Sequence, residues 1–141
     1  MGTETQKVIR ALLDTNVFLS ALVLRGPTNQ LVSQWQEEKF CPVICREILE
    51  EYLRVLAYPK FQLSAEEIKR LVEREFLPYA HPVKLKEIPP VIRQDPSDDI
   101  FLACALAGRC HYLVTGDHHL LALKTYKGIP IVPVKTFSML P

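Results

Sequence analysis

Several features that would place a chain in a class at once are missing from this sequence. Its 141 residues hold no repeat and no apolar run approaching the ~20 residues of a membrane-spanning helix. The polar start, MGTETQK, lacks the charged and then apolar layout of a signal peptide. We therefore expect a cytoplasmic protein with no membrane partner, folded as one domain over residues 1–141, since this length suits one hydrophobic core.

Net charge and cysteine are also scarce. The 17 Lys and Arg against 16 Asp and Glu leave a net charge of +1, whereas strong non-specific nucleic-acid binders are distinctly basic. A nucleic-acid function must therefore rest on a local site. The four cysteines are too few and too irregularly spaced for a disulfide scaffold. No second Cys or His pair accompanies Cys41 and Cys45 in CPVIC, so we expect buried or half-buried free thiols and no metal there.

Strand-like and helix-like segments alternate along the chain, and 48% hydrophobic with 23% charged residues is typical of a folded protein. Apolar runs predict strands at 8–13, 40–45, 79–83, 111–117 and 129–134. Helices are expected at 17–24, from Thr28 as a cap, at 46–58, at 64–77 with a capping box from Ser64 to Glu67, at 97–108 and at 119–123, with a crossing loop at 86–94. This alternation indicates an α/β fold, a three-layer αβα sandwich with a mainly parallel central sheet, but leaves the strand order open.

Two of the predicted strands lead into an Asp. ALLDTN places Asp14 directly after one strand, followed by Thr15 and Asn16, and YLVTGD places Asp117 at the end of another. Ligands of open parallel sheets bind beyond the carboxyl ends of the strands, so both carboxylates are expected at one edge. Either Asp alone more often caps the next helix or closes an Asx turn. The two together favour a site.

Two helices offer further acids. DPSDD carries Asp98 and Asp99 into the first turn of an almost wholly apolar helix, where acids are also stabilised by the exposed N–H groups. On the helix at 46–58, Glu51 borders the apolar face, whereas Glu50 borders its opposite side and can pair with Arg54 four residues on. A solvated charged face is the ordinary alternative for these glutamates.

Carboxylates gathered in one pocket repel each other unless a cation neutralises them. Mg²⁺ and Mn²⁺ take oxygen ligands and keep several waters, and such a cation suits the hydrolysis of a phosphodiester. The acids therefore predict a Mg²⁺ or Mn²⁺ site. His118 and His119 lack the spacing or cysteine partners of a zinc site. We expect them to be exposed polar residues at the start of a short helix, with a ligand or general base as the less favoured alternative.

The order and spacing of four blocks are specific: LLDTNVFLSAL, EILEEYLRVL, DPSDDIFLACALAG and YLVTGDHHLL. With these blocks the chain resembles the PIN-domain family, which includes the VapC-like ribonuclease toxins of bacterial toxin–antitoxin pairs. The resemblance implies a PIN-like αβα fold and a Mg²⁺- or Mn²⁺-dependent endoribonuclease that hydrolyses phosphodiester bonds of single-stranded RNA. It further implies an antitoxin partner that covers the acidic groove, and a homodimer.

The resemblance also implies which residues act. The catalytic and metal-binding set consists of four acids, Asp14, Glu51, Asp98 and Asp117. The polar residues Thr15, Asn16 and Thr115 support this set, and Asp99 is the alternative to the adjacent Asp98. Asp14 and Asp98 are implied as direct ligands, with Glu51 and Asp117 holding the cation, a second cation or its waters.

Two other classes of function fit less well. A catalytically silent PIN module that binds nucleic acid or protein is the alternative that the near-zero net charge favours. A phospho-accepting receiver domain also places acids at strand ends, but it needs a Lys after a late strand, and the strand that ends in VTGD has none there.

Overall fold

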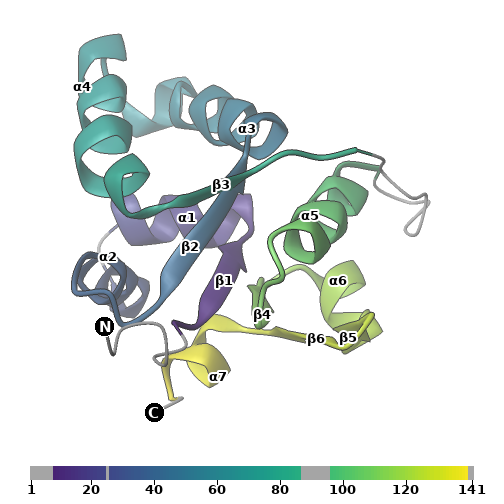
Figure 1. The fold of residues 1–141 in the computed structure, drawn as a ribbon. Helices are drawn as coiled ribbons and strands as arrows, with labels where there is room; N and C mark the ends of the chain where they lie inside the picture. The colour runs from purple at the N-terminus through teal and green to yellow at the C-terminus, as the bar shows by residue number, and fades with distance from the viewer. Residues whose placement is uncertain (1–7, 25, 87–95, 140–141) are drawn as a thin grey trace.

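The computed structural model describes residues 8–24, 26–86 and 96–139 of the chain. Six strands among these residues form one sheet in the order β3-β2-β1-β4-β6-β5 (Figure 1). Their bounds are β1 Arg10–Leu13, β2 Cys41–Cys45, β3 His81–Val83, β4 Tyr112–Val114, β5 Thr125–Tyr126 and β6 Ile129–Val132. All neighbours run parallel except β5 and β6, which are antiparallel. The predicted α/β fold with a mainly parallel central sheet is confirmed.

Seven α-helices lie within the described ranges. Their bounds are α1 Thr15–Leu22, α2 Gln30–Gln36, α3 Arg46–Leu56, α4 Ala65–Arg70, α5 Pro96–Ala107, α6 His118–Leu123 and α7 Val134–Ser138. A π-helical turn at Leu71–Phe76 and a 3₁₀ turn at Leu77–Tyr79 extend α4 toward β3. No helix in these ranges combines the length and the apolar character that crossing a membrane requires.

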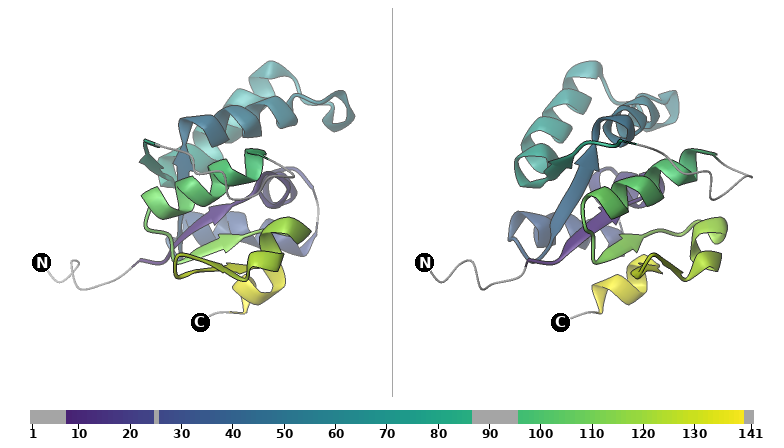
Figure 2. Two further views of the ribbon diagram at one scale, coloured as in Figure 1. Left: turned by 90° about the vertical axis from the view of Figure 1, so that its right-hand side faces the viewer. Right: turned by 45° about the vertical axis from the view of Figure 1, so that its right-hand side comes forward.

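The position of β1 at the centre of the sheet explains why its residues are apolar at successive positions. Ala11, Leu12 and Leu13 are 0%, 0% and 1% exposed. Helix α5 contacts β1, β2 and β4, and α1 and α2 lie on the other side of the sheet (Figures 1 and 2). A parallel strand covered on both faces has no polar face, so both sets of alternating side chains must be apolar.

Two helix caps were predicted from the sequence, and the structure tests both. The Ser64 hydroxyl accepts from the Glu67 N–H at 3.0 Å, and the Glu67 carboxylate accepts from the Ser64 N–H at 2.8 Å, so the predicted capping box is confirmed. The prediction that Thr28 caps a helix is wrong. Thr28 lies inside the 3₁₀ turn Pro27–Asn29, because Pro27 suits the first helical position and begins the turn earlier.

An aromatic cluster anchors α3 beside the carboxyl end of β1. The rings of Phe18 and Tyr52 stack with centroids 3.8 Å apart, and Phe76 meets Phe18 edge-on at 4.9 Å. The buried Tyr52 hydroxyl also donates a hydrogen bond to the carbonyl of Leu13, the last residue of β1. This bond fixes the rotation of α3 about its axis. It thereby sets the direction of Glu51, the residue that precedes Tyr52.

The carboxyl-terminal part differs from the expected single strand at 129–134. A hairpin joins β5 to β6 through Lys127 and Gly128, whose φ values of 47° and +85° suit the tight turn of a hairpin. The last strand then stops at Val132, and α7 follows. A strand of two residues is too short to show an alternating pattern. The predicted crossing loop at 86–94 lies outside the described residues except for Lys86.

The cysteines behave as the sequence predicts. All four are free thiols, three of them buried and Cys41 half-buried. Burial raises the pKa of the Cys110 thiol to about 12. A thiol with so high a pKa stays protonated at neutral pH and is a poor nucleophile.

Candidate metal centre in an acidic cleft

The parallel pairing of β1 with β4 brings Asp14 and Asp117 to the same edge of the sheet. The Asp14 N–H donates to the Val114 carbonyl at 3.0 Å, and the Thr115 N–H donates to the Val132 carbonyl at 2.9 Å. The chain therefore leaves β1 and β4 side by side, and Asp117 follows three residues after the end of β4. The predicted juxtaposition of these two strand ends is confirmed.

An open cleft of about 330 Å³ lies at this edge. Four acids and two polar residues singled out from the sequence line it, together with two further polar or charged side chains and two apolar ones. In that order they are Asp14, Glu51, Asp98 and Asp117; Thr15 and Asn16; Arg54 and Tyr58; and Val55 and Phe101. The acids come from the ends of β1 and β4, from α3 and from α5.

Hydrogen bonds orient both oxygens of Asp14. Its Oδ1 accepts from the Val17 N–H at 2.8 Å and so caps α1, which begins two residues earlier than predicted. Its Oδ2 accepts from the Thr115 hydroxyl. Asp14 is only 7% exposed, and this burial raises its pKa above the usual value despite these bonds, with the Asp117 charge adding to the rise. The cleft therefore places a carboxylate where a nearby cation would favour its ionised form.

Thr115 links the two strand ends. Its side chain is fully buried, its hydroxyl donates to Asp14, and the same oxygen accepts from the Asp117 N–H at 2.9 Å. Thr115 is not among the residues that line the cleft. Its position behind Asp14 fits the supporting role that the resemblance implied.

Glu51 is held by one residue from α1 and one from its own helix. Its Oε2 accepts from the Thr15 hydroxyl, and its Oε1 lies 3.6 Å from the Arg54 guanidinium. Arg54 therefore pairs with Glu51, three residues before it, and not with Glu50 as predicted. Glu51 and Arg54 both line the cleft, whereas Glu50 is exposed and does not belong to the lining.

The two adjacent acids at the start of α5 occupy different positions. Asp98 lines the cleft and is 7% exposed, whereas Asp99 is 4% exposed and does not belong to the lining. Successive helical residues point about 100° apart, so only one of the two can face a given side. The structure thus places Asp98 in the cleft and Asp99 beside it.

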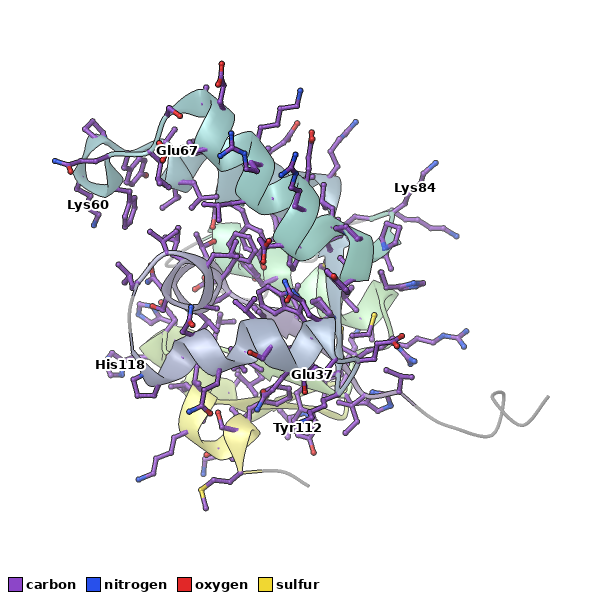
Figure 3. All side chains as sticks on the ribbon, turned by 90° about the vertical axis from the view of Figure 1, so that its left-hand side faces the viewer. Glu37, Lys60, Glu67, Lys84, Tyr112 and His118 are labelled. Carbon is purple, nitrogen blue, oxygen red and sulfur yellow. The ribbon has the colours of Figure 1, made fainter. Side chains whose placement is uncertain are left out.

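His119, set aside on sequence grounds, lies near two of these acids although it does not belong to the lining of the cleft. Asp98, Asp117 and His119 each offer one ligand atom, and these atoms all lie within 4.8 Å of one another. Asp117 caps α6 through Oδ1, which accepts from the N–H groups of His119 and Leu120 at 2.8 and 3.1 Å. Figure 3 labels the neighbouring His118, which lies on the same side of the molecule as Lys60 after α3. Nothing in the local sequence pattern singles out His119, because its approach to Asp98 depends on how α5 and α6 lie in the fold.

This donor set fits a divalent cation. Cation–donor distances of about 2.0–2.2 Å place the ligands of an octahedral ion roughly 3 Å apart at right angles and roughly 4.3 Å apart in trans positions. The donor atoms of Asp98, Asp117 and His119 all lie within 4.8 Å of one another, so small side-chain movements would bring them to these separations. Asp14 and Glu51 line the same cleft outside this group of three. Their carboxylates supply further oxygens of the kind that Mg²⁺ and Mn²⁺ accept.

The fold and the cleft together define an α/β protein with a cation-compatible acidic site at the carboxyl edge of a parallel sheet. The chain belongs to the PIN-domain family, because the model of the PIN domain matches residues 10–119. That range contains all four acids of the cleft. No curated protein matches the sequence significantly.

Two solved structures have a similar fold. One is VapBC2 from Rickettsia felis bound to a DNA fragment from their promoter, with a TM-score of 0.61 and 14% identity, covering 89% of this chain and 98% of that chain. The other is PAE2754 from Pyrobaculum aerophilum, with a TM-score of 0.55 and 17% identity, covering 92% of this chain and 86% of that one. At such identities the likeness concerns the fold alone.

Proposed function

We propose that the chain is a Mg²⁺- or Mn²⁺-dependent endoribonuclease that hydrolyses phosphodiester bonds of single-stranded RNA. The observation that carries this proposal is the convergence of Asp14, Glu51, Asp98 and Asp117 on one cleft. Members of the PIN-domain family are generally nucleases, which supports a hydrolase role. The buried, hydrogen-bonded setting of Asp14 supports a site that is preorganised before a cation or substrate arrives.

In this proposal the residues in and behind the cleft divide into those that hold the cation and those that orient them. Asp98, Asp117, Asp14 and Glu51 hold the cation, which when bound activates a water and neutralises charge on the phosphoryl oxygens. Thr115 and the Val17 N–H fix the direction of the Asp14 carboxylate. The Thr15 hydroxyl fixes Glu51 in the same way, and Arg54 reduces the negative charge at the mouth of the cleft.

The rim of the cleft supports a single-stranded nucleic acid as substrate. Tyr58 is 39% exposed, and its hydroxyl accepts from the Arg54 guanidinium at 2.9 Å. Proteins bind single strands by stacking bases on aromatic rings while cationic groups contact the backbone. Arg54 and Tyr58 bring both kinds of group to the cleft that holds the acids. A local site of this kind is compatible with a chain whose net charge is only +1.

The decisive experiment is cleavage of a labelled RNA by the full chain. We expect single-stranded RNA to be cut in Mg²⁺ or Mn²⁺ and to stay intact in EDTA, with a duplex of the same sequence as the comparison substrate. Asp98→Asn and Glu51→Gln should each lower the rate about 100-fold or more, as losses of site residues do. Glu50→Gln is the matched control, because Glu50 is exposed on the same helix.

Cation binding without cleavage of any RNA or single-stranded DNA would replace this proposal by the silent binding module. Full activity in the Asp98 and Glu51 variants would instead show that the site lies elsewhere. Melting curves of each variant without metal distinguish a lost function from a lost fold.

We further propose that the chain is the toxin of a toxin–antitoxin pair and forms a homodimer. The likeness of its fold to VapBC2 supports the toxin–antitoxin pairing, and the homodimer rests on the resemblance to the PIN-domain family. Induced expression in a bacterial host should arrest growth, and Asp98→Asn should relieve the arrest. A small adjacent reading frame whose product blocks RNA cleavage would identify the antitoxin, and light scattering of the purified chain would test the dimer.

A further inference from the structure

We propose that His119 supplies a nitrogen ligand to the cation held by Asp98 and Asp117, and that this ligand makes the site bind Mn²⁺ in preference to Mg²⁺. The inference rests on the proposed cation site, since it assigns that site a further ligand. The ligands proposed above are the four carboxylates of the cleft, and His119 adds an imidazole to them.

The position of His119 follows from the way α6 begins. Asp117 caps the helix through Oδ1, and one of its two bonds comes from the N–H of His119 itself, at 2.8 Å. This bond holds the His119 backbone beside the Asp117 carboxylate. Because the cap occupies Oδ1, Oδ2 is the oxygen that can bind a cation while the cap remains intact. A carboxylate oxygen of Asp117 and a ring nitrogen of His119 lie within 4.8 Å of each other, so a cation on this carboxylate would lie within reach of the imidazole.

The imidazole is suitably placed but is not hydrogen-bonded to its neighbour. His119 Nδ1 lies 3.9 Å from Asp117 Oδ1, which is longer than the roughly 2.7–3.2 Å of a hydrogen bond. Its side chain is 55% exposed, so rotation about its χ angles can move the ring by about an ångström at little cost in packing. An ion pair between such exposed groups contributes little to stability. Because His119 is grouped with Asp98 as well as with Asp117, we argue that the three residues coordinate one cation.

A nitrogen ligand changes which cation the site prefers. Mg²⁺ binds carboxylates, carbonyls and water, and takes imidazole poorly, whereas first-row transition metals accept imidazole readily. Carboxylates alone would discriminate weakly between Mg²⁺ and Mn²⁺. Mn²⁺ also takes carboxylates and water, but as a first-row transition metal it accepts imidazole better than Mg²⁺ does, so removal of the imidazole should weaken Mn²⁺ binding more than Mg²⁺ binding.

The test is calorimetric titration of the full chain with MnCl₂ and with MgCl₂, in the absence of RNA. The variants are His119→Asn, the matched control His118→Asn, and Asp98→Asn, which removes a carboxylate ligand. Both histidines are exposed and adjacent at the start of α6, and Asn leaves the backbone N–H that bonds to Asp117 in place. Melting curves without metal verify that each variant is folded.

We expect His119→Asn to raise the Kd for Mn²⁺ at least about tenfold, because loss of an outer partner of a metal ligand already costs about that much. The Kd for Mg²⁺ should change less than about threefold, and His118→Asn should change neither. Equal losses for both cations, no loss at all, or a wild-type chain that binds no Mn²⁺ would each overturn the inference.

RNA cleavage measured in parallel separates this inference from the proposed function. If the wild type binds Mn²⁺ through His119 but cuts no RNA, the nuclease proposal fails and the ligand assignment stands. If it cuts RNA while His119→Asn and wild type bind both cations alike, the ligand assignment fails and the nuclease proposal stands.

Discussion

Replacing Thr115 by Val removes one buried hydroxyl while keeping the shape of the side chain. This hydroxyl donates to the Asp14 carboxylate and accepts from the Asp117 N–H. A hydrogen bond to a charged group contributes about 1.5–3 kcal/mol and one between neutral groups about 0.5–1.5 kcal/mol. Val fills the same volume, so no cavity adds to the loss. We expect Thr115→Val to lower the free energy of unfolding at neutral pH by about 2–4.5 kcal/mol.

This loss should depend on pH in a defined direction. Burial already raises the pKa of Asp14 above the ordinary value of 3.8 for an aspartate, and the Thr115 hydroxyl opposes that rise. Without the hydroxyl the folded-state pKa rises further, while the unfolded-state pKa is unchanged. The folded variant therefore binds more protons than the folded wild type as Asp14 titrates. The stability gap between the two must widen as pH rises through this range and narrow in acid.

The assay is urea denaturation of the metal-free chain at acidic and at neutral pH, with Thr115→Ser as the matched control. Ser keeps the hydroxyl and loses one methyl group, so its loss should be smaller and nearly independent of pH. Cation affinity should also fall about 10–100-fold in Thr115→Val, the usual effect of removing the partner that orients a metal ligand. A gap that is the same at all pH values, or a Ser variant as unstable as the Val variant, would refute the reasoning.

Three further predictions follow from single contacts. Tyr52→Phe leaves the Leu13 carbonyl without its buried donor and should cost about 1–3 kcal/mol in urea denaturation; an unchanged midpoint would contradict this. Gly108→Ala would place a Cβ 2.5 Å from Val43 Cγ1 and should cost about 1–3 kcal/mol, a loss that the double variant with Val43→Ala should partly recover. The metal-free chain should lose stability as pH rises above 3.8 through the raised pKa of Asp14, because its folded state then holds the extra proton; Asp14→Asn should lack this component.

Local patterns were sufficient for the parts of the fold that local interactions decide. The run of apolar residues in β1, the amphipathic period of α3 and the Ser64 capping box each depend on residues near one another in the chain. Strand order depends on which strands meet in three dimensions, and no pattern within one segment carries that information. Strand β5 has only two residues and is defined by its partner β6. That residues 1–141 form one domain, and that two copies pair, stay predictions.

The candidate site divides in the same way. The positions of Asp14 and Asp117 follow from a general property of parallel sheets, so they could be predicted as neighbours. Which of Asp98 and Asp99 faces the cleft depends on how α5 is rotated, and packing against β1, β2 and β4 sets that rotation. For His119, sequence spacing argued against a zinc motif. Spacing says nothing about a histidine that reaches the acids across a helix cap.

The two interpretations of the strand-end acids, as helix caps and as site residues, are compatible, because a carboxylate has two oxygens. Asp117 uses Oδ1 to cap α6, which leaves Oδ2 as the oxygen available to a cation. Asn caps a helix about as well as Asp but carries no charge, whereas Ala does neither, at a cost of about 1 kcal/mol. Asp117→Asn should therefore retain the unfolding free energy measured in urea and lose cation affinity, while Asp117→Ala should lose both. If Asn costs as much stability as Ala, the Oδ1 cap is not what holds α6, and the assignment of one oxygen to each role is wrong.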